Sequence, residues 1–204
     1  MSSPHNTILT IGHSNHSLET FIGLLVQHRV TVLADVRSAP YSRFNPHFNR
    51  EPLATALKAR KIRYVYLGRE LGGRSDDPDC YEDGHIIYDR LAQTDHFRKG
   101  IERVMRGAVE HRIVLMCSEK EPVDCHRTFL VAKSLAEQGM DIKHIHADGR
   151  LESHVDAMQR LINRFSLEQE QQDMFSQQQS RTELIAEAVT RQAGRVAHTG
   201  TITK

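Results

Sequence analysis

The sequence predicts a three-layer α/β fold in which a mainly parallel sheet of about five strands lies between two layers of helices. Short apolar runs of strand length alternate along the chain with amphipathic stretches of helical spacing. This alternation implies right-handed crossovers between parallel strands. The most chemically unusual residues directly follow the predicted strands, at the sheet edge where ligands bind in open α/β sheets. The sequence therefore predicts a functional site at the carboxyl edge of the sheet.

The individual elements follow from hydrophobic spacing. Strands are predicted at residues 7–11, 31–34, 63–67, 112–116 and 141–146. Helices are predicted from Ser17 to His28, at 51–60, at 86–110 in one or two pieces, at 128–138 and at 151–164. Irregular loops are expected at 38–49 and 68–84, and the second is long enough to act as a lid.

Length and composition indicate one domain with an appendage. The 204 residues, of which 39% are hydrophobic and 26% charged, suit a single α/β domain at 1–165. The Gln-rich tail at 166–204 is expected to be solvated and partly helical or disordered, with a helix at 182–192. A net charge of +1 means that nucleic-acid binding would need a local arginine cluster. With no signal peptide or apolar membrane span, the chain is expected to be cytoplasmic and without a membrane partner.

The stretch at residues 115–127 carries most of the reactive chemistry. Cys117 is expected to end a buried strand, and Pro122 and Asp124 to start a helix whose first turn holds Cys125 and His126. A thiol at a helix N-terminus ionises more readily. The predicted catalytic residues, serving as nucleophile or redox centre, its partner and proton carriers, are Cys117, Cys125, His126, Glu119 and His13. The alternative is a pair of small buried core thiols.

A metal site is a second interpretation of the same residues. Cys117, Cys125 and His126, with or without His13, would supply two sulfur ligands and one or two nitrogen ligands. The spacing of eight between the cysteines matches no standard zinc motif, and adjacent Cys and His residues rarely bind one ion. The sequence therefore ranks metal binding below thiol chemistry, predicts no metal ligand and leaves the cofactor open.

Further residues along the same edge suit an anionic substrate. A turn after the first strand offers backbone N–H groups, an Asp and an Arg follow the second, and the loop at 37–50 interleaves arginines with aromatic residues. Ordinary turns and loops are the alternative. The predicted substrate-binding residues are Gly12, Ser14, Asp35, Arg37, Tyr41, Ser42, Arg43, Gly72, Gly73, Arg74 and Arg127.

The tail carries a motif of its own. Gln171, Asp173, Met174 and Phe175 resemble the short peptide with which many bacterial DNA polymerases and repair proteins bind the sliding clamp. The alternative is a pair of apolar side chains that fold back on the domain.

Four ordered motifs together resemble a known family. They are Thr10-Ile11-Gly12-His13-Ser14, Asp35-Val36-Arg37, Leu67-Gly68 with Leu71-Gly72-Gly73, and Met116-Cys117 through Cys125-His126-Arg127. The chain is similar, over about residues 7–150, to the bacterial and archaeal family catalogued as domain of unknown function 488. The resemblance implies a family-wide site at these positions and no settled reaction.

The combined prediction is a thiol-dependent enzyme that acts on a phosphate-bearing substrate, a nucleotide or nucleic acid, in DNA maintenance. One alternative is a non-catalytic module that binds nucleic acid or the sliding clamp and holds a structural Cys/His metal site. The other is a thiol redox or sulfur-transfer protein, which requires Cys117 and Cys125 to form a disulfide reversibly. The sequence leaves the oligomeric state open.

Overall fold

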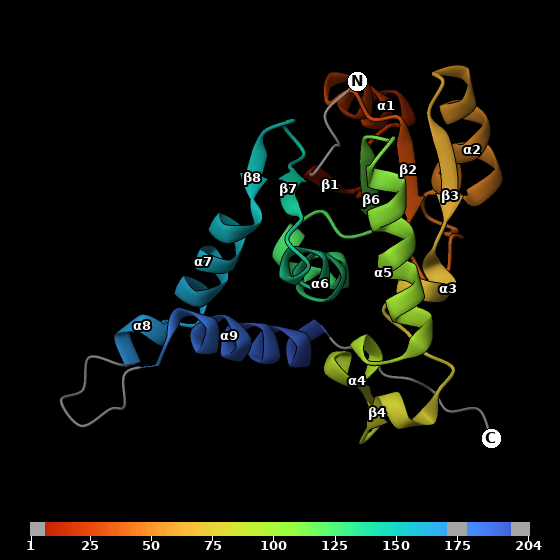
Figure 1. Cartoon of the computed structure of the whole chain (residues 1–204). Coiled ribbons are helices and arrows are strands. Elements are labelled where there is room, and N and C mark those ends of the chain that lie inside the picture. Colours follow the sequence, from red (N-terminus) through yellow and green to blue (C-terminus); the bar gives the residue numbers. More distant parts are fainter. Residues whose placement is uncertain (1–6, 171–178, 197–204) are drawn as a thin grey trace.

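A six-stranded, mostly parallel sheet forms the centre of the molecule (Figure 1). The computed structural model describes residues 7–170 and 179–196. Within them the strand order is β3-β2-β6-β1-β7-β8, and β8 alone runs antiparallel to its neighbour. The strands are β1 Thr7–Gly12, β2 Val32–Asp35, β3 Arg63–Tyr66, β6 Ile113–Cys117, β7 Asp141–Ile145 and β8 Leu151–Ser153. The predicted α/β class is therefore confirmed.

Helices cover both faces of this sheet. Along β6, Val114 and Met116 pack with the α1 and α2 side, whereas Ile113 and Leu115 pack into the core formed by the remaining long helices. Both faces are apolar, as expected for parallel strands covered on two sides. The α-helices are α1 Leu18–Gln27, α2 Arg50–Ala59, α3 Gly68–Leu71, α4 Tyr88–Ala92, α5 Asp95–Ala108, α6 Lys133–Glu137, α7 His154–Arg164, α8 Leu167–Glu170 and α9 Arg181–Val196.

The predicted helix at 151–164 is shorter than expected because its first three residues form β8. Leu151–Ser153 pairs with β7 after a tight turn at Gly149, which has a φ of +82°. Ser153 then caps α7 by accepting a hydrogen bond from the amide of Asp156. A three-residue strand that continues directly into a helix leaves no periodic signal of its own.

The expected loop at 68–84 contains regular structure. It holds α3, the 3₁₀ turn η2 (Pro78–Cys80) and β4 (Tyr81–Glu82), which forms a small hairpin with β5 (His85–Ile86) directly after the loop. The helical region that follows is two helices, α4 and α5, and Thr94 caps the second. A further 3₁₀ turn, η1 (Pro46–Phe48), lies in the predicted loop at 38–49.

The helix predicted at 182–192 is present as α9, but it packs against the domain instead of being solvated. α9 begins at Arg181 and buries Leu184, Ala188 and Val189 in the same core as α5 and α7. It crosses below α7 and extends towards α4 (Figure 1). The proposed clamp-binding residues Gln171, Asp173, Met174 and Phe175 lie outside the described residues. No helix in the described part of the chain is long and apolar enough to cross a membrane.

Candidate functional site

The thiol-bearing loop follows β6, but its helix starts later than predicted. Pro122 and Asp124 form a separate 3₁₀ turn, η3 (Pro122–Asp124), which the amide of Cys125 closes by donating to the carbonyl of Pro122 at 3.2 Å. Cys125 itself is extended, with φ −139° and ψ 138°. It therefore occupies the cap position directly before the helix instead of the first turn that the sequence predicted, and its carbonyl accepts a hydrogen bond from the amide of Thr128 at 2.9 Å.

The helix after the loop opens with a wide π-helical segment, η4 (Arg127–Ala132), whose six side chains are all buried. It continues as α6, so the predicted helix at 128–138 is present with a different first half. π-Helical turns are rare and frequent at functional sites. No Gly or Pro in the segment marks the change of pitch in the sequence.

The two thiols and one imidazole of this loop converge. The Sγ atoms of Cys117 and Cys125 lie 3.7 Å and 3.9 Å from Nδ1 of His126. Nε2 of His126 lies 3.1 Å from the carbonyl oxygen of Val36, which can only accept, so Nε2 donates. Nδ1 is thereby left facing both sulfur atoms, placed to share a proton with them.

The surroundings shift the pKa values of the two thiols in opposite directions. The hydrogen bond to Cys125, together with burial, raises the pKa of the Cys117 thiol well above its ordinary value. Burial also raises the pKa of Cys125, but the hydrogen bond from Cys117 and the charge of Arg127 outweigh it, so that the net pKa is lowered. Cys125 is therefore the sulfur that ionises first, whereas the sequence assigned the nucleophile to Cys117.

A cavity of about 530 Å³ opens onto these atoms. Besides the two cysteines and His126, it brings cationic, anionic and aromatic side chains together. Burial raises the pKa of Glu119, and this effect exceeds the opposing charge of Arg127. The other lining residues are Arg37, Ser38, Ala39, Arg74, Tyr88, Ser118, Glu119, Asp124 and Val196.

Arg37, which lines the cavity, forms a buried ion pair with Asp35. Nη2 of Arg37 donates to Oδ2 of Asp35 at 2.6 Å, and Tyr64 donates its hydroxyl hydrogen to the same oxygen at 2.7 Å. Asp35 is completely buried and Arg37 nearly so. Because the carboxylate is shared between these donors, Asp35 orients Arg37 and does not itself face the cavity.

His13 is buried next to this ion pair rather than in the cavity lining. Its Nδ1 donates to the carbonyl of Ser14 at 2.8 Å, and Nη1 of Arg37 lies 3.3 Å from its Nε2. The ring stacks on Phe48 at 4.4 Å. Burial lowers the pKa of His13 to about 4. With both nitrogens occupied, this geometry gives no support to the predicted proton carrier.

The turn Gly12-His13-Ser14 continues the sheet instead of cradling an anion. The amides of His13 and Ser14 donate to the carbonyls of Cys117 and Ser118, each at 2.9 Å. A side chain at Gly12 would come within 1.8 Å of the carbonyl oxygen of Glu119. Gly12 therefore permits the close approach of the thiol loop, and these two amides are not free for a phosphate.

Arg127 supports the loop from below. Nη1 donates to the carbonyl oxygen of Glu119 at 2.7 Å, and Nη2 lies 3.4 Å from that of Lys120. The side chain is fully buried and is not part of the cavity lining. Arg127 acts on the thiols through its charge and not by touching a ligand in the cavity.

The glycine turn at 72–73 packs against the imidazole. A Cβ atom at Gly73 would lie 3.0 Å from Cγ and 3.1 Å from Nδ1 of His126, and one at Gly72 would lie 2.6 Å from the hydroxyl of Ser38. Arg74 follows directly, is exposed and lines the cavity. The close packing of the turn thus holds Arg74 at the entrance and the ring of His126 in place.

The arginine- and aromatic-rich loop is outside the cavity, although Ser38 and Ala39 at its start line it. Tyr41 is exposed and donates to Glu51 at 2.9 Å. Ser42 accepts hydrogen bonds from two amides of the loop, and Arg43 is exposed. These three predicted binding residues are therefore not brought together with the thiols.

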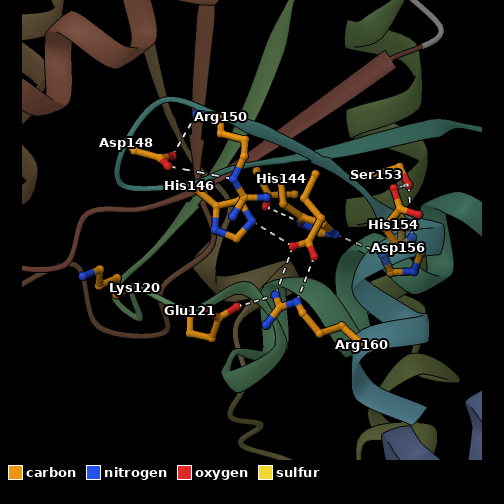
Figure 2. A network of polar contacts seen from close by, with 12 residues as sticks. Lys120, Glu121, His144, His146, Asp148, Arg150, Ser153, His154, Asp156 and Arg160 are labelled. Atoms are coloured by element: carbon orange, nitrogen blue, oxygen red, sulfur yellow. Dashed lines mark hydrogen bonds and ion pairs between the residues drawn. The ribbon is translucent and has the colours of Figure 1, made fainter. Parts of the chain in front are cut away.

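Three side chains that the sequence did not single out hold the thiol loop from the opposite side. Arg160 of α7 donates to Glu121 at 2.6 Å (Figure 2). It also binds Glu152 at 2.8 Å. Arg164 pairs with Asp124, which also accepts from Gln192 of α9 at 2.8 Å. The loop is thus fixed at both ends of η3 by α7 and α9.

Tyr88 and Val196 are cavity residues that the sequence did not indicate. Tyr88 packs on Phe129 with ring centroids 5.0 Å apart, and burial raises its pKa. In the sequence, an aromatic residue at the start of a helix is typical of an ordinary core position. Val196, the last residue of α9, reaches the cavity only because that helix packs back on the domain.

Comparison with known proteins adds one finding. The family model described as "Domain of unknown function DUF488" matches residues 17–134, which is more than half of the chain. The matched range contains the thiol loop, the ion pair and the glycine turn. Neither the curated proteins nor the solved structures gave a match. The chain therefore belongs to the family of the domain of unknown function DUF488.

Proposed function

We propose that this protein is a thiol-dependent enzyme that acts on a phosphate-bearing substrate. The observation that carries the proposal is the convergence of Cys117, Cys125 and Nδ1 of His126 at the base of a cavity that Arg37 and Arg74 border. Two core thiols would not need an imidazole held between them, since buried cysteines pack as small hydrophobic side chains.

The side chains have separate roles in this proposal. The thiol proton of Cys125 moves to Nδ1 of His126, and the sulfur bonds to the electrophilic atom of the substrate as the bond from that atom to its leaving group breaks. His126 then gives the proton to the leaving group. Cys117 keeps its proton and stabilises the thiolate of Cys125 by donating a hydrogen bond to it. Val36 and Gly73 are positioning residues, because they fix the ring of His126 without touching the substrate.

Charge and size support an anionic substrate of nucleotide dimensions. Arg74 makes no hydrogen bond or ion pair within the described residues, so its guanidinium is available at the entrance. A cavity of about 530 Å³ lies within the usual range for small-molecule sites. The loop that starts at Ser38 leads to the exposed rings of Tyr41 and Phe44, which would suit the next bases of a single strand. A cytoplasmic DNA-maintenance role is part of this proposal.

The test is protection of Cys125 from alkylation. Reduced, chelator-treated protein is labelled with iodoacetamide in the presence of nucleotides, sugar phosphates or short single-stranded DNA, and labelling at each cysteine is followed by mass spectrometry. A phosphate compound that slows labelling of Cys125, but not in Arg74→Ala, supports the proposal. Arg69→Ala is the matched control, because Arg69 lines only the neighbouring cavity. Equal labelling with every compound would refute the phosphate assignment.

A second candidate is a dithiol redox protein. The Sγ atoms of Cys117 and Cys125 lie within 4.8 Å of one another, close enough to join after a small movement. Treatment with a mild disulfide oxidant would then remove two hydrogen atoms from the native protein, and dithiothreitol would restore them. A chain that keeps both thiols under these conditions excludes this function.

A further inference from the structure

The thiol–imidazole cluster has the composition and dimensions of a metal site. Sγ of Cys117, Sγ of Cys125 and a ring nitrogen of His126 all lie within 4.8 Å of one another. The sequence argued against a shared ion because Cys125 and His126 are adjacent. The extended backbone at Cys125, followed by helical φ and ψ angles at His126, turns both side chains to the same point.

The distances fit one tetrahedral ion. With zinc–sulfur bonds of about 2.3 Å and zinc–nitrogen bonds of about 2.0 Å, tetrahedral geometry places sulfur and nitrogen ligands about 3.5 Å apart. The two sulfur-to-nitrogen distances here are 3.7 Å and 3.9 Å. Movements of a few tenths of an ångström would bring both to the zinc-bound value. The two sulfur atoms, which lie within 4.8 Å of one another, would have to come to about 3.8 Å.

The surroundings hold the ligands as they are held in established metal sites. Metal-binding histidines usually donate their second ring N–H to a carbonyl or carboxylate. His126 does so to Val36, and Gly73 packs against the imidazole. The backbone of Cys117 is fixed by the amide of His13, and that of Cys125 by Thr128, whose amide donates to it at 2.9 Å.

We infer that Cys117, Cys125 and His126 bind a zinc ion whose fourth position faces the cavity. Two sulfur ligands and an imidazole suit zinc better than a hard cation such as magnesium. Among the described residues no fourth ligand joins the cluster, so the cavity supplies water or a substrate atom. Each thiol that still carries a proton releases it to solvent when the ion binds.

This inference stands apart from the proposed thiol chemistry. Zinc and an alkylating reagent use the same sulfur electrons, so the metal-bound cluster withholds Cys125 from covalent reaction. If zinc binds, the cell's free zinc determines how much of the protein has reactive thiols. If it does not bind, the thiol proposal is unaffected.

The experiment uses the full chain, reduced and stripped by chelator, then equilibrated with one equivalent of zinc and desalted. Native mass spectrometry is expected to show one zinc per chain, retained in Cys80→Ser and lost in Cys117→Ser, Cys125→Ser and His126→Gln. Cys80 is the matched control because it is a buried free cysteine outside the cluster.

A second measurement needs no variant and covers the case in which the substitutions disturb folding. Cobalt added to the stripped wild type is expected to give a thiolate-to-cobalt charge-transfer band and the intense visible bands of tetrahedral cobalt. Wild-type protein that retains no zinc after desalting and shows no such bands overturns the inference. Retention that depends on Cys80 instead of Cys117 overturns it as well.

Discussion

His126 and His13 show how two similar buried histidines acquire different tasks. In each, one ring nitrogen donates to a backbone carbonyl, that of Val36 for His126 and that of Ser14 for His13. The second nitrogen of His126 faces two thiols in an open cavity, whereas that of His13 faces Arg37 in the packed interior. The partner of the second nitrogen therefore distinguishes the cluster that we propose to be reactive from the one that supports the fold.

The largest expected effect is a loss of stability when the buried charge of Arg37 is left without its partner. Asp35→Asn keeps the shape of the side chain but leaves the guanidinium of Arg37 buried without a carboxylate. We expect a loss of about 3 to 5 kcal/mol in the free energy of unfolding, measured by urea titration.

Glu82→Gln is the control, because the ion pair between Glu82 and Arg90 is exposed. Its loss is expected to cost about 1 kcal/mol or less. Equal effects of Asp35→Asn and Glu82→Gln would show that the buried ion pair does not support the fold.

The next largest expected effect is a loss of stability at acidic pH, through protonation of His13. Burial lowers the pKa of His13 from 6.5 to about 4, with a further contribution from the charge of Arg37. The unfolded chain therefore binds the proton more strongly than the folded one, so stability is complete above pH 6.5 and falls as the pH drops towards 4. The loss attributable to His13 is about 3 kcal/mol.

Urea unfolding at several pH values measures this slope in the wild type and in His13→Gln, whose side chain does not titrate in this range. Burial also lowers the pKa of His154 to about 4, so part of the slope remains in the variant. An unchanged slope in His13→Gln would contradict the lowered pKa of His13.

A smaller effect, on the alkylation rate of Cys125, is expected in the cluster of Cys117, Cys125 and His126. His126→Gln removes one hydrogen bond that favours the ionised form of Cys125. A hydrogen bond to a charged group contributes about 1.5 kcal/mol, so the alkylation rate of Cys125, measured at a pH below that at which its thiol ionises, should fall about tenfold.

His13→Gln is expected to leave that rate unchanged while it lowers the stability of the fold. Labelling of chelator-treated protein, followed by mass spectrometry, gives the rate for each variant. Equal slowing by the two substitutions would mean that the clusters are not separate.

The sequence predicted these two clusters unequally well, for physical reasons. Strand periodicity places Cys117, Asp35 and His13 at the carboxyl edge of the sheet, and parallel strands bring those ends together. The orientation of Cys125 depends on its extended backbone, which no periodic pattern encodes. The same holds for whether His13 faces the cavity or Phe48.

Packing between distant segments was the second feature that the sequence did not predict. The apolar residues Leu184, Ala188 and Val189 share one face of α9, but the Gln-rich composition before them suggested a solvated segment. Only the fold brings Val196 to the cavity and Gln192 to Asp124. The packing of α9 on the loop that carries the thiols depends on tertiary contacts between distant segments, which local sequence patterns do not encode.

The most direct test of the reactive cluster is the pH dependence of iodoacetamide labelling at each cysteine of the reduced, metal-free protein. We predict that Cys125 reacts at a pH below that at which an ordinary thiol ionises, because its pKa is lowered, and that Cys117 reacts only at higher pH. Cys80, which lies in the core away from the cavity, should react only after unfolding. If Cys125 instead reacts no more readily than Cys80, the thiol–imidazole cluster is not a reactive site.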